Sequence, residues 1–255
     1  MATTTSTVTA HQRVRIDPLR RTSLVAGGFY LVTFVSIPTL WLYGPVRNAD
    51  YVTGAGSSSG LLWGAFLEII VAIAGIGTAV TLFPVVRRQN EATALGFVAT
   101  RTLEAAMIFV GVLSLLTIVT LRKDGGGADA ASLAVAGKSF VGIYDWTFLL
   151  GQTLMPALNA LLLGSLMYRS RLVPRIIPTL GLIGSPLLLA TVASVLFGIL
   201  PKVSALSGIA TLFVAGWEFS LGVYLVVKGF KPSPITSEIA AANTRGNTVP
   251  ERQNP

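Results

Sequence analysis

The sequence predicts an all-α integral membrane protein, a bundle of six transmembrane helices, from two observations. Hydrophobic residues make up 52% of the 255 residues and charged residues only 12%, about half the charged share of a soluble domain, and the mean hydropathy is +0.70. The apolar residues are also gathered into runs as long as a bilayer is thick. The charged residues are too few to cover a water-facing surface, and the apolar side chains are therefore expected to face lipid.

Polar links separate the apolar runs, and polar tails flank them. About 20 apolar residues span a bilayer, and longer runs are expected to tilt or to project into the headgroups. Residues 1–23, rich in Thr and then in Arg, are predicted to form a disordered basic tail, 24–228 the membrane domain, and 229–255 a second disordered tail. The predicted spans, in chain order, are 24–43, 61–86, 94–121, 140–168, 176–200 and 203–227.

The basic residues outside the spans indicate an orientation. Most of them lie in the two tails and in the links 87–93 and 169–175. Lys and Arg gather on the cytoplasmic side of membrane proteins, so both termini are expected in the cytoplasm of a bacterium, with the bundle in its plasma membrane. This distribution accounts for the net charge of +8, and no nucleic-acid partner is expected. The expected partners are the bilayer and its anionic headgroups, contacted by Arg169, Arg171 and Arg175.

Several kinds of chemistry are excluded by residues that the sequence lacks. There is no cysteine, which excludes disulfides, thiolate metal sites and cysteine nucleophiles. The only histidine, His11, lies outside every predicted span, so intramembrane proteases that depend on histidine are excluded. The chain contains no HExxH, Walker or GxGxxG motif. Accordingly, neither a metal site nor a cofactor is expected.

Five ionisable residues lie inside the predicted spans, where each costs about 3 kcal/mol at a helix centre. Such residues are expected to face protein or water. Arg101 and Glu104 are three residues apart and therefore adjacent on one helix surface. Lys138, Asp145, Gln152 and Asn159 recur every seven residues, which predicts one polar stripe. The five intramembrane residues are Glu68, Arg101, Glu104, Asp145 and Glu218.

Four of these residues are expected to form one outer cluster of three acids and Arg101. Glu68 and Asp145 are expected about 8–11 Å below the outer surface, Glu104 near the middle of its helix and Arg101 one turn further in. If all four ionise, the cluster carries a charge of about −2, which a dry site does not tolerate. Either some carboxyl groups keep their protons, or a cationic ligand binds, or water enters. Glu218 shares its face with Ser and Gly and is a secondary candidate, more typical of helix packing. The primary candidates for a ligand- or ion-binding site are Glu68, Arg101, Glu104, Asp145, Gln152 and Asn159.

Two stretches carry a resemblance to a known family. They are LEIIVAIAGIGTAVTLFPVVRRQNEATALGFVATRTLEA, residues 67–105, and LLLGSLMYRSRLVPRIIPTLGLIG, residues 161–184. With the Asp145-Trp146 pair, their order and spacing resemble a bacterial membrane protein family catalogued as domain of unknown function 4386, over about residues 20–228. The resemblance implies a multi-pass integral membrane protein and brings no activity with it.

Three functions therefore stay open. The first is binding or transport of a proton, a cation or a small cationic solute by the acid-rich cluster. The second is a non-catalytic scaffold or regulatory subunit, in which Arg101 pairs with Glu68 or Asp145 to fix helix packing. The third is a lipid-modifying enzyme, with Asp145 or Glu68 as general acid or base and an unpaired Arg101 holding a phosphate. Binding or transport is favoured over catalysis, and no catalytic residue is assigned.

Overall fold

The computed structural model describes residues 17–48, 50–54, 56–124 and 127–247, and six of its helices are long and apolar enough to cross a membrane. Within these residues every regular element is helical, which confirms the predicted all-α fold with six spans. The elements are α1 (Pro18–Val32), η1 (Thr33–Ser36), α2 (Thr39–Leu42), η2 (Pro45–Arg47), α3 (Ser59–Val86), α4 (Glu91–Asp124), α5 (Ala130–Thr147), η3 (Phe148–Leu154), α6 (Met155–Ser170), α7 (Ile176–Leu196), α8 (Ala205–Val227) and α9 (Pro234–Asn247).

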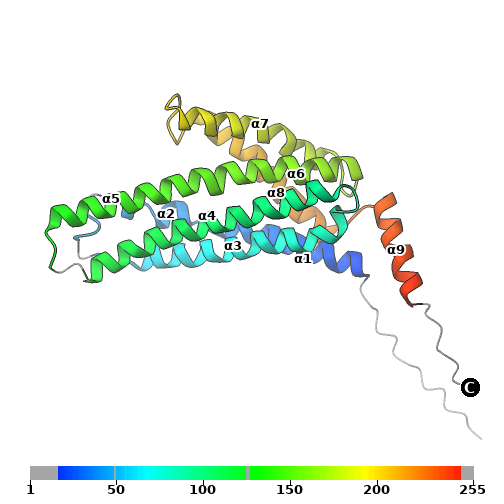
Figure 1. Ribbon diagram of the computed structural model, residues 1–255, viewed down its shortest axis with the longest axis horizontal. Coiled ribbons are helices and arrows are strands. Elements are labelled where there is room, and N and C mark those ends of the chain that lie inside the picture. The colour runs from blue at the N-terminus through cyan, green and yellow to red at the C-terminus, as the bar shows by residue number, and fades with distance from the viewer. Residues whose placement is uncertain (1–16, 49, 55, 125–126, 248–255) are drawn as a thin grey trace, which may run out of the picture.

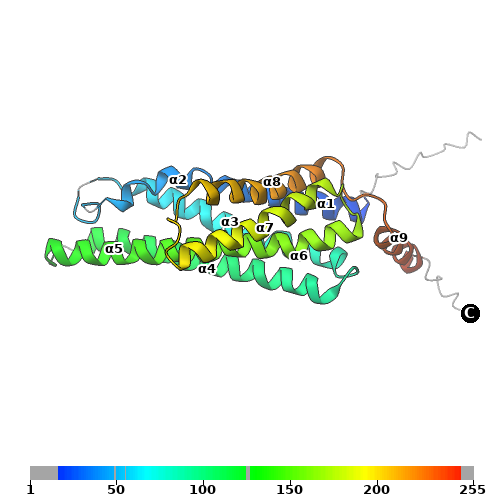
Figure 2. The same ribbon diagram turned by 90° about the horizontal axis from the view of Figure 1, so that it is seen from above.

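The spans form a closed ring in which chain neighbours lie side by side along a common long axis (Figures 1 and 2). α1 packs on α3, α3 on α4, α4 on α5 and α6, α6 on α7, α7 on α8, and α8 returns to α1. Glycines allow the closest approaches. A Cβ on Gly27 of α1 would lie 2.7 Å from the carbonyl oxygen of Gly222 on α8. A Cβ on Gly181 of α7 would lie 2.8 Å from the indole ring of Trp217 on α8.

Two helices extend beyond the thickness of a bilayer. α4 has 34 residues, and the path from α5 to α6 has 41. At 1.5 Å per residue they are about 50 Å and 60 Å long, against about 30 Å for the hydrocarbon core. The α4–α5 hairpin therefore projects past α2 at one end of the bundle (Figure 1). Asp129 caps α5 by accepting from the Ser132 N–H at 2.9 Å, and hydrogen bonds from Ser132 lower the pKa of Asp129.

The first span is interrupted near its middle, whereas the sequence predicted an unbroken run over 24–43. α1 ends at Val32, and the 3₁₀ turn η1 follows it. Pro38 lacks an amide hydrogen, and its ring clashes with the carbonyl four residues earlier, that of Phe34. The Thr33 hydroxyl donates to the Tyr30 carbonyl at 2.6 Å, and the Ser36 hydroxyl donates to the Thr33 carbonyl at 3.1 Å.

The opposite end of the bundle carries the start of α1, the α3–α4 turn and α9 (Figure 1). Helix α1 starts at Pro18, ahead of the predicted start of the span. Its Arg20 donates to the carbonyls of Leu225 at 3.1 Å and Val226 at 2.6 Å, at the end of α8. Helix α9 occupies part of the stretch for which the sequence predicted a disordered tail, and Ile235 packs into the apolar core. Residues 1–16, with His11, and 248–255 lie outside the described residues.

Candidate functional site

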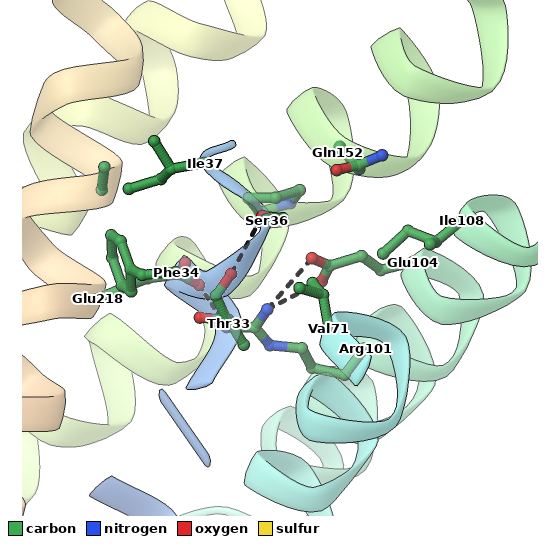
Figure 3. Close-up of a pocket in the computed structure, with 12 residues that line it drawn as sticks. Thr33, Phe34, Ser36, Ile37, Val71, Arg101, Glu104, Ile108, Gln152 and Glu218 are labelled. Carbon is green, nitrogen blue, oxygen red and sulfur yellow. Dashed lines mark hydrogen bonds and ion pairs between the residues drawn. The ribbon is translucent and has the colours of Figure 1, made fainter. Parts of the chain in front are cut away.

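Arg101 is the centre of a buried ion-pair network between α4 and α8. Its side chain is 2% exposed, and Nη1 donates to Glu104 Oε2 at 3.0 Å and to Oε1 at 3.2 Å. Nη2 donates to the Glu218 carboxyl across the ring (Figure 3). The guanidinium also lies 5.3 Å from the ring centroid of Tyr30 on α1. One buried arginine thus holds two carboxyl groups from two helices.

A side-chain amide ties α6 to the same network. Asn159 Nδ2 donates to Glu104 Oε2 at 2.6 Å, and the Thr100 hydroxyl donates to Asn159 Oδ1. Glu104 therefore accepts from α4 and from α6, which fixes its position. With both carboxyl groups ionised, Arg101, Glu104 and Glu218 together carry a charge of −1.

A cavity of about 190 Å³ opens beside this network. Bulk water occupies about 30 Å³ per molecule, so the cavity has room for about six waters. Glu218 is the most accessible of the three ionisable side chains, at 13% exposed. Its second carboxyl oxygen accepts no hydrogen bond from the described residues, and the Glu218 side chain lines the cavity. The lining residues include Thr33, Ser36, Arg101, Glu104, Gln152 and Glu218 (Figure 3).

Two spans depart from α-helical geometry beside the cavity. The 3₁₀ turn η1 supplies Thr33 and Ser36, and the π-helical segment η3 supplies Gln152. Inside a membrane, irregular backbone is tolerated where it is buried in protein or lines a cavity, and π-helical turns are frequent at functional sites. Arg101 lies about 15 Å along α4 from its start at Glu91. This distance is half of the roughly 30 Å that a hydrocarbon core measures.

Glu68 lies apart from this network, on α3. It is fully buried, and its Oε1 accepts from the Tyr144 hydroxyl at 3.0 Å and from Gln152 Nε2 at 3.2 Å. No lysine or arginine among the described residues forms an ion pair with it. Because Gln152 also lines the cavity, it connects Glu68 to the Arg101 site.

Asp145 lies in a third place, outside the cavity. It accepts from Arg47 Nη2 at 2.7 Å and Nη1 at 3.1 Å, and Lys202 Nζ lies 3.6 Å away. The hydrogen bond to Asp145 raises the pKa of Arg47. Lys202 also lies 4.5 Å from the ring centroid of Trp146. These contacts link η2, α5 and the α7–α8 loop, and the Arg47 side chain is half exposed.

The single cluster predicted from the sequence is therefore corrected to three separate groups, around Arg101, Glu68 and Asp145. The predicted stripe along the fourth span is interrupted by η3, between Asp145 and Asn159. A π-helical segment adds a residue per turn and rotates the following side chains out of a seven-residue repeat. Glu218, ranked second from its small-residue face, is a direct partner of Arg101. The pairing of Arg101 with Glu68 or Asp145 is absent from the described residues.

The basic turn between α6 and α7 is exposed, as a headgroup-contacting segment would be. Arg169, Arg171 and Arg175 are all exposed, and Arg175 lies 4.7 Å from the ring centroid of Tyr168. Arg171 ends α6 in the left-handed conformation, with φ of 55°. Their contact with anionic lipid stays a prediction.

A comparison with family models gives one match. The model described as Domain of unknown function (DUF4386) matches residues 25–229, which cover most of the first span and the other five in full. No curated protein and no solved structure matches the chain. Within the described residues, no group of three His, Cys, Asp or Glu side chains is placed to hold a metal ion.

Proposed function

We propose, from the premise that this chain belongs to the family described as Domain of unknown function (DUF4386), that the protein binds a small cationic solute in its central cavity and carries it across the membrane. The solute classes that fit are a small protonated amine and an inorganic cation. The site residues are Glu218 and Glu104, with Arg101 holding both carboxyl groups in place.

The observation that carries this proposal is the charge of the cavity wall. Arg101 neutralises only one of the two carboxylates, and both carboxylate side chains line the cavity. A net charge of −1 in a low-dielectric layer is unfavourable by itself. A bound cation would compensate that charge. An anion at the same place would be repelled by the net negative charge of the wall.

The size of the cavity limits the solute. About 190 Å³ is below the 300–1,000 Å³ of pockets for drug-sized ligands. It fits a partly hydrated inorganic cation or an amine of a few heavy atoms. The Thr33 and Ser36 hydroxyls donate to main-chain carbonyls, so their oxygens face a solute as acceptors.

The broken helices support transport in particular. Secondary transporters bind substrates near the bilayer midplane between discontinuous helices, whose irregular backbone provides ligands and a place to bend. Here η1 and η3 flank the cavity. The α1–η1–α2 segment, interrupted at Pro38, is the element we expect to move when the solute enters.

A structural role for the same network is the second candidate. It is favoured by the pairing of Arg101, whose two terminal nitrogens are both held by carboxylates, while Nε is buried without a partner among the described residues. The same pairing counts against a lipid-modifying enzyme, because it leaves no terminal nitrogen of Arg101 free to hold a phosphate.

A thermal-shift experiment separates the two. The purified protein in detergent is unfolded in the presence of sodium, potassium, methylammonium or ethanolamine, as wild type and as Glu218→Gln. A cation that binds only the folded state at 100 times its Kd adds about 2.7 kcal/mol, or about 5–11 °C for a protein of this size. The shift is expected in wild type and is expected to vanish in Glu218→Gln. Glu91→Gln, at the exposed start of the same network helix α4, is the matched control.

Two results would contradict binding. If none of these cations raises the Tm of the wild type, or if they raise the Tm of Glu218→Gln as much as that of Glu91→Gln, the network has only a structural role. The variants would then differ from wild type only by a constant change in stability.

For the membrane surface, we propose that the end bearing Arg169, Arg171 and Arg175 faces the cytoplasm and contacts anionic lipid. The exposure of all three side chains supports this. Exchanging the three for Gln is expected to reduce the anionic lipid that copurifies in nanodiscs of mixed composition. Exchanging Arg87 and Arg88, at the neighbouring α3–α4 turn, tests whether the lipid is bound by one turn or by the whole basic end.

A further inference from the structure

Glu68 is an acid in an environment that does not stabilise its charge. The residue is fully buried on α3, and no cationic side chain of the described residues pairs with it. Removing a carboxylate from water without a counter-charge costs several kcal/mol. The neutral acid avoids that cost because it carries no charge.

The groups that face Glu68 are uncharged or are occupied elsewhere. Tyr144 from α5 and Gln152 from η3 donate to it. From α4, Arg101 and Glu104 bond to each other. Tyr43, which follows α2, packs with its ring edge-on to Tyr144 at 5.3 Å between centroids.

From η2, Arg47 pairs with Asp145. No neighbouring helix therefore presents a free charge to Glu68 among the described residues.

The two oxygens of Glu68 differ in a way that matches a carboxylic acid. Oε1 accepts two hydrogen bonds, as the carbonyl oxygen of an acid does. Oε2 is buried and has no partner among the described residues, and the same is true of the Tyr43 hydroxyl. Tyr43 packs on Gly64, one helical turn before Glu68 on the same face of α3, so closely that a Cβ there would overlap its ring. A proton on Oε2 removes the unpaired buried charge, and the Tyr43 hydroxyl, which can accept as well as donate, is a partner for the resulting acid O–H.

We propose that Glu68 is a proton-binding site separate from the Arg101 network, and that it exchanges its proton with water in the central cavity, on the side where Gln152 lies between the two. Taking up one proton from water changes Glu68 from a charge of −1 to neutral. Gln152 is the group common to both sites, because its amide donates to Glu68 and its side chain lines the cavity. Coupling between this proton and a cationic solute rests on the proposed function, whereas the proton site itself does not.

Infrared spectroscopy of the purified wild type and of Glu68→Gln at neutral pH tests the proton site. A protonated carboxyl group has its own C=O stretching band, which shifts in D₂O. The wild type is expected to show a band that is missing from Glu68→Gln and present in Glu104→Gln, the matched control. A wild-type spectrum that differs from Glu68→Gln only in carboxylate bands overturns the proposal.

Two further variants keep the test decisive if Glu68→Gln does not fold. Tyr43→Phe keeps the aromatic ring and removes the orphaned hydroxyl, and it is expected to shift the frequency of the acid band. Gln152→Leu is expected to keep the band and to slow its shift after transfer to D₂O. If Tyr43→Phe does not shift the frequency of the acid band and Gln152→Leu does not slow its shift in D₂O, the proton belongs to another residue and the proposal is overturned. None of these measurements needs a bound solute, so they stand even if no cation binds.

Discussion

Exchanging Arg101 for Met removes the only positive charge in the central network and keeps an unbranched side chain that is two atoms shorter. Arg101 holds Glu104 at 3.0 Å and also holds Glu218, and it is 2% exposed. In Arg101→Met, two carboxyl groups from α4 and α8 would face each other without a counter-charge. Removing one partner of a buried ion pair typically costs about 3–5 kcal/mol.

For a protein of this size, 1 kcal/mol corresponds to about 2–4 °C in Tm. The Arg101→Met variant is therefore expected to unfold about 6–20 °C below wild type at neutral pH. Unpaired carboxyl groups regain neutrality by taking up protons, so the difference from wild type is expected to shrink as the pH falls. The triple variant Arg101→Met, Glu104→Gln, Glu218→Gln carries no charge in the network and is expected to recover most of the loss.

The assay is thermal unfolding of the purified variants in one detergent between pH 4 and pH 8. An Arg101→Met variant that unfolds within about 2 °C of wild type would refute the reasoning, because one partner of a buried ion pair cannot be removed without leaving the other partner's charge unpaired. A triple variant as unstable as Arg101→Met would show that shape, and not charge, holds this part of the bundle together.

Two smaller effects follow from the packing and from the surface. Gly64→Ala is expected to lower stability by about 1–3 kcal/mol, because the added Cβ overlaps the Tyr43 ring. Gly75→Ala on the same helix adds a Cβ with nothing within 4 Å of it and is expected to be neutral or stabilising. Thermal unfolding of the two variants checks this. Asp145→Asn breaks the half-exposed pair with Arg47 and is expected to cost no more than about 1 kcal/mol, with the difference vanishing in high salt.

Equal stabilities for the two glycine variants would mean that the Tyr43 ring is free to move. Tyr43 would then not be held beside Glu68 as the structure shows. A loss of several kcal/mol in Asp145→Asn that salt does not reduce would mean that Asp145 belongs to the buried sites after all.

The number of spans follows from sequence because it depends on a local property, the length of an apolar run. The interruption of the first span is also local in cause, since Pro38 follows Thr33 and Ser36. It was missed because hydropathy does not respond to a missing amide hydrogen. Arg101 and Glu104 were placed side by side for a local reason too, since residues three apart on one helix are neighbours on its surface.

The partners across the ring could not be read from the sequence. Helical periodicity gives the face on which Glu218 lies, but not which helix that face meets, and the closing contact of α8 with α1 brings it to the centre. The separation of Asp145 from Asn159 depends on η3. A π-helical segment has no clear signal in a single sequence, because its residues are as apolar as those of the helices on either side.

The direction from which the cavity is reached gives a last prediction. Apolar side chains, among them Phe97, Leu163 and Trp217, fill the bundle between the cavity and the α3–α4 turn. The polar residues Gln152 and Glu68 lie on the other side. Beyond them, at the α2 end, lies an apolar cluster that includes Tyr43, Leu61 and Leu115. Water is therefore expected to enter from this half of the bundle at its side, past the interrupted first span, which lines the cavity.

The absence of cysteine from the chain makes this testable with single-cysteine variants. Ser36→Cys places a thiol on the cavity wall. It is expected to react faster with a cationic methanethiosulfonate reagent than with an anionic one of similar size, because the wall carries a net negative charge. Ser185→Cys, fully buried on α7, is expected to be inert, and Ser57→Cys, exposed outside the spans, is expected to show no such preference. If Ser36→Cys were as inert as Ser185→Cys, water would not reach the cavity past the interrupted first span. If it showed as little preference as Ser57→Cys, the charge that we assign to the cavity would be absent.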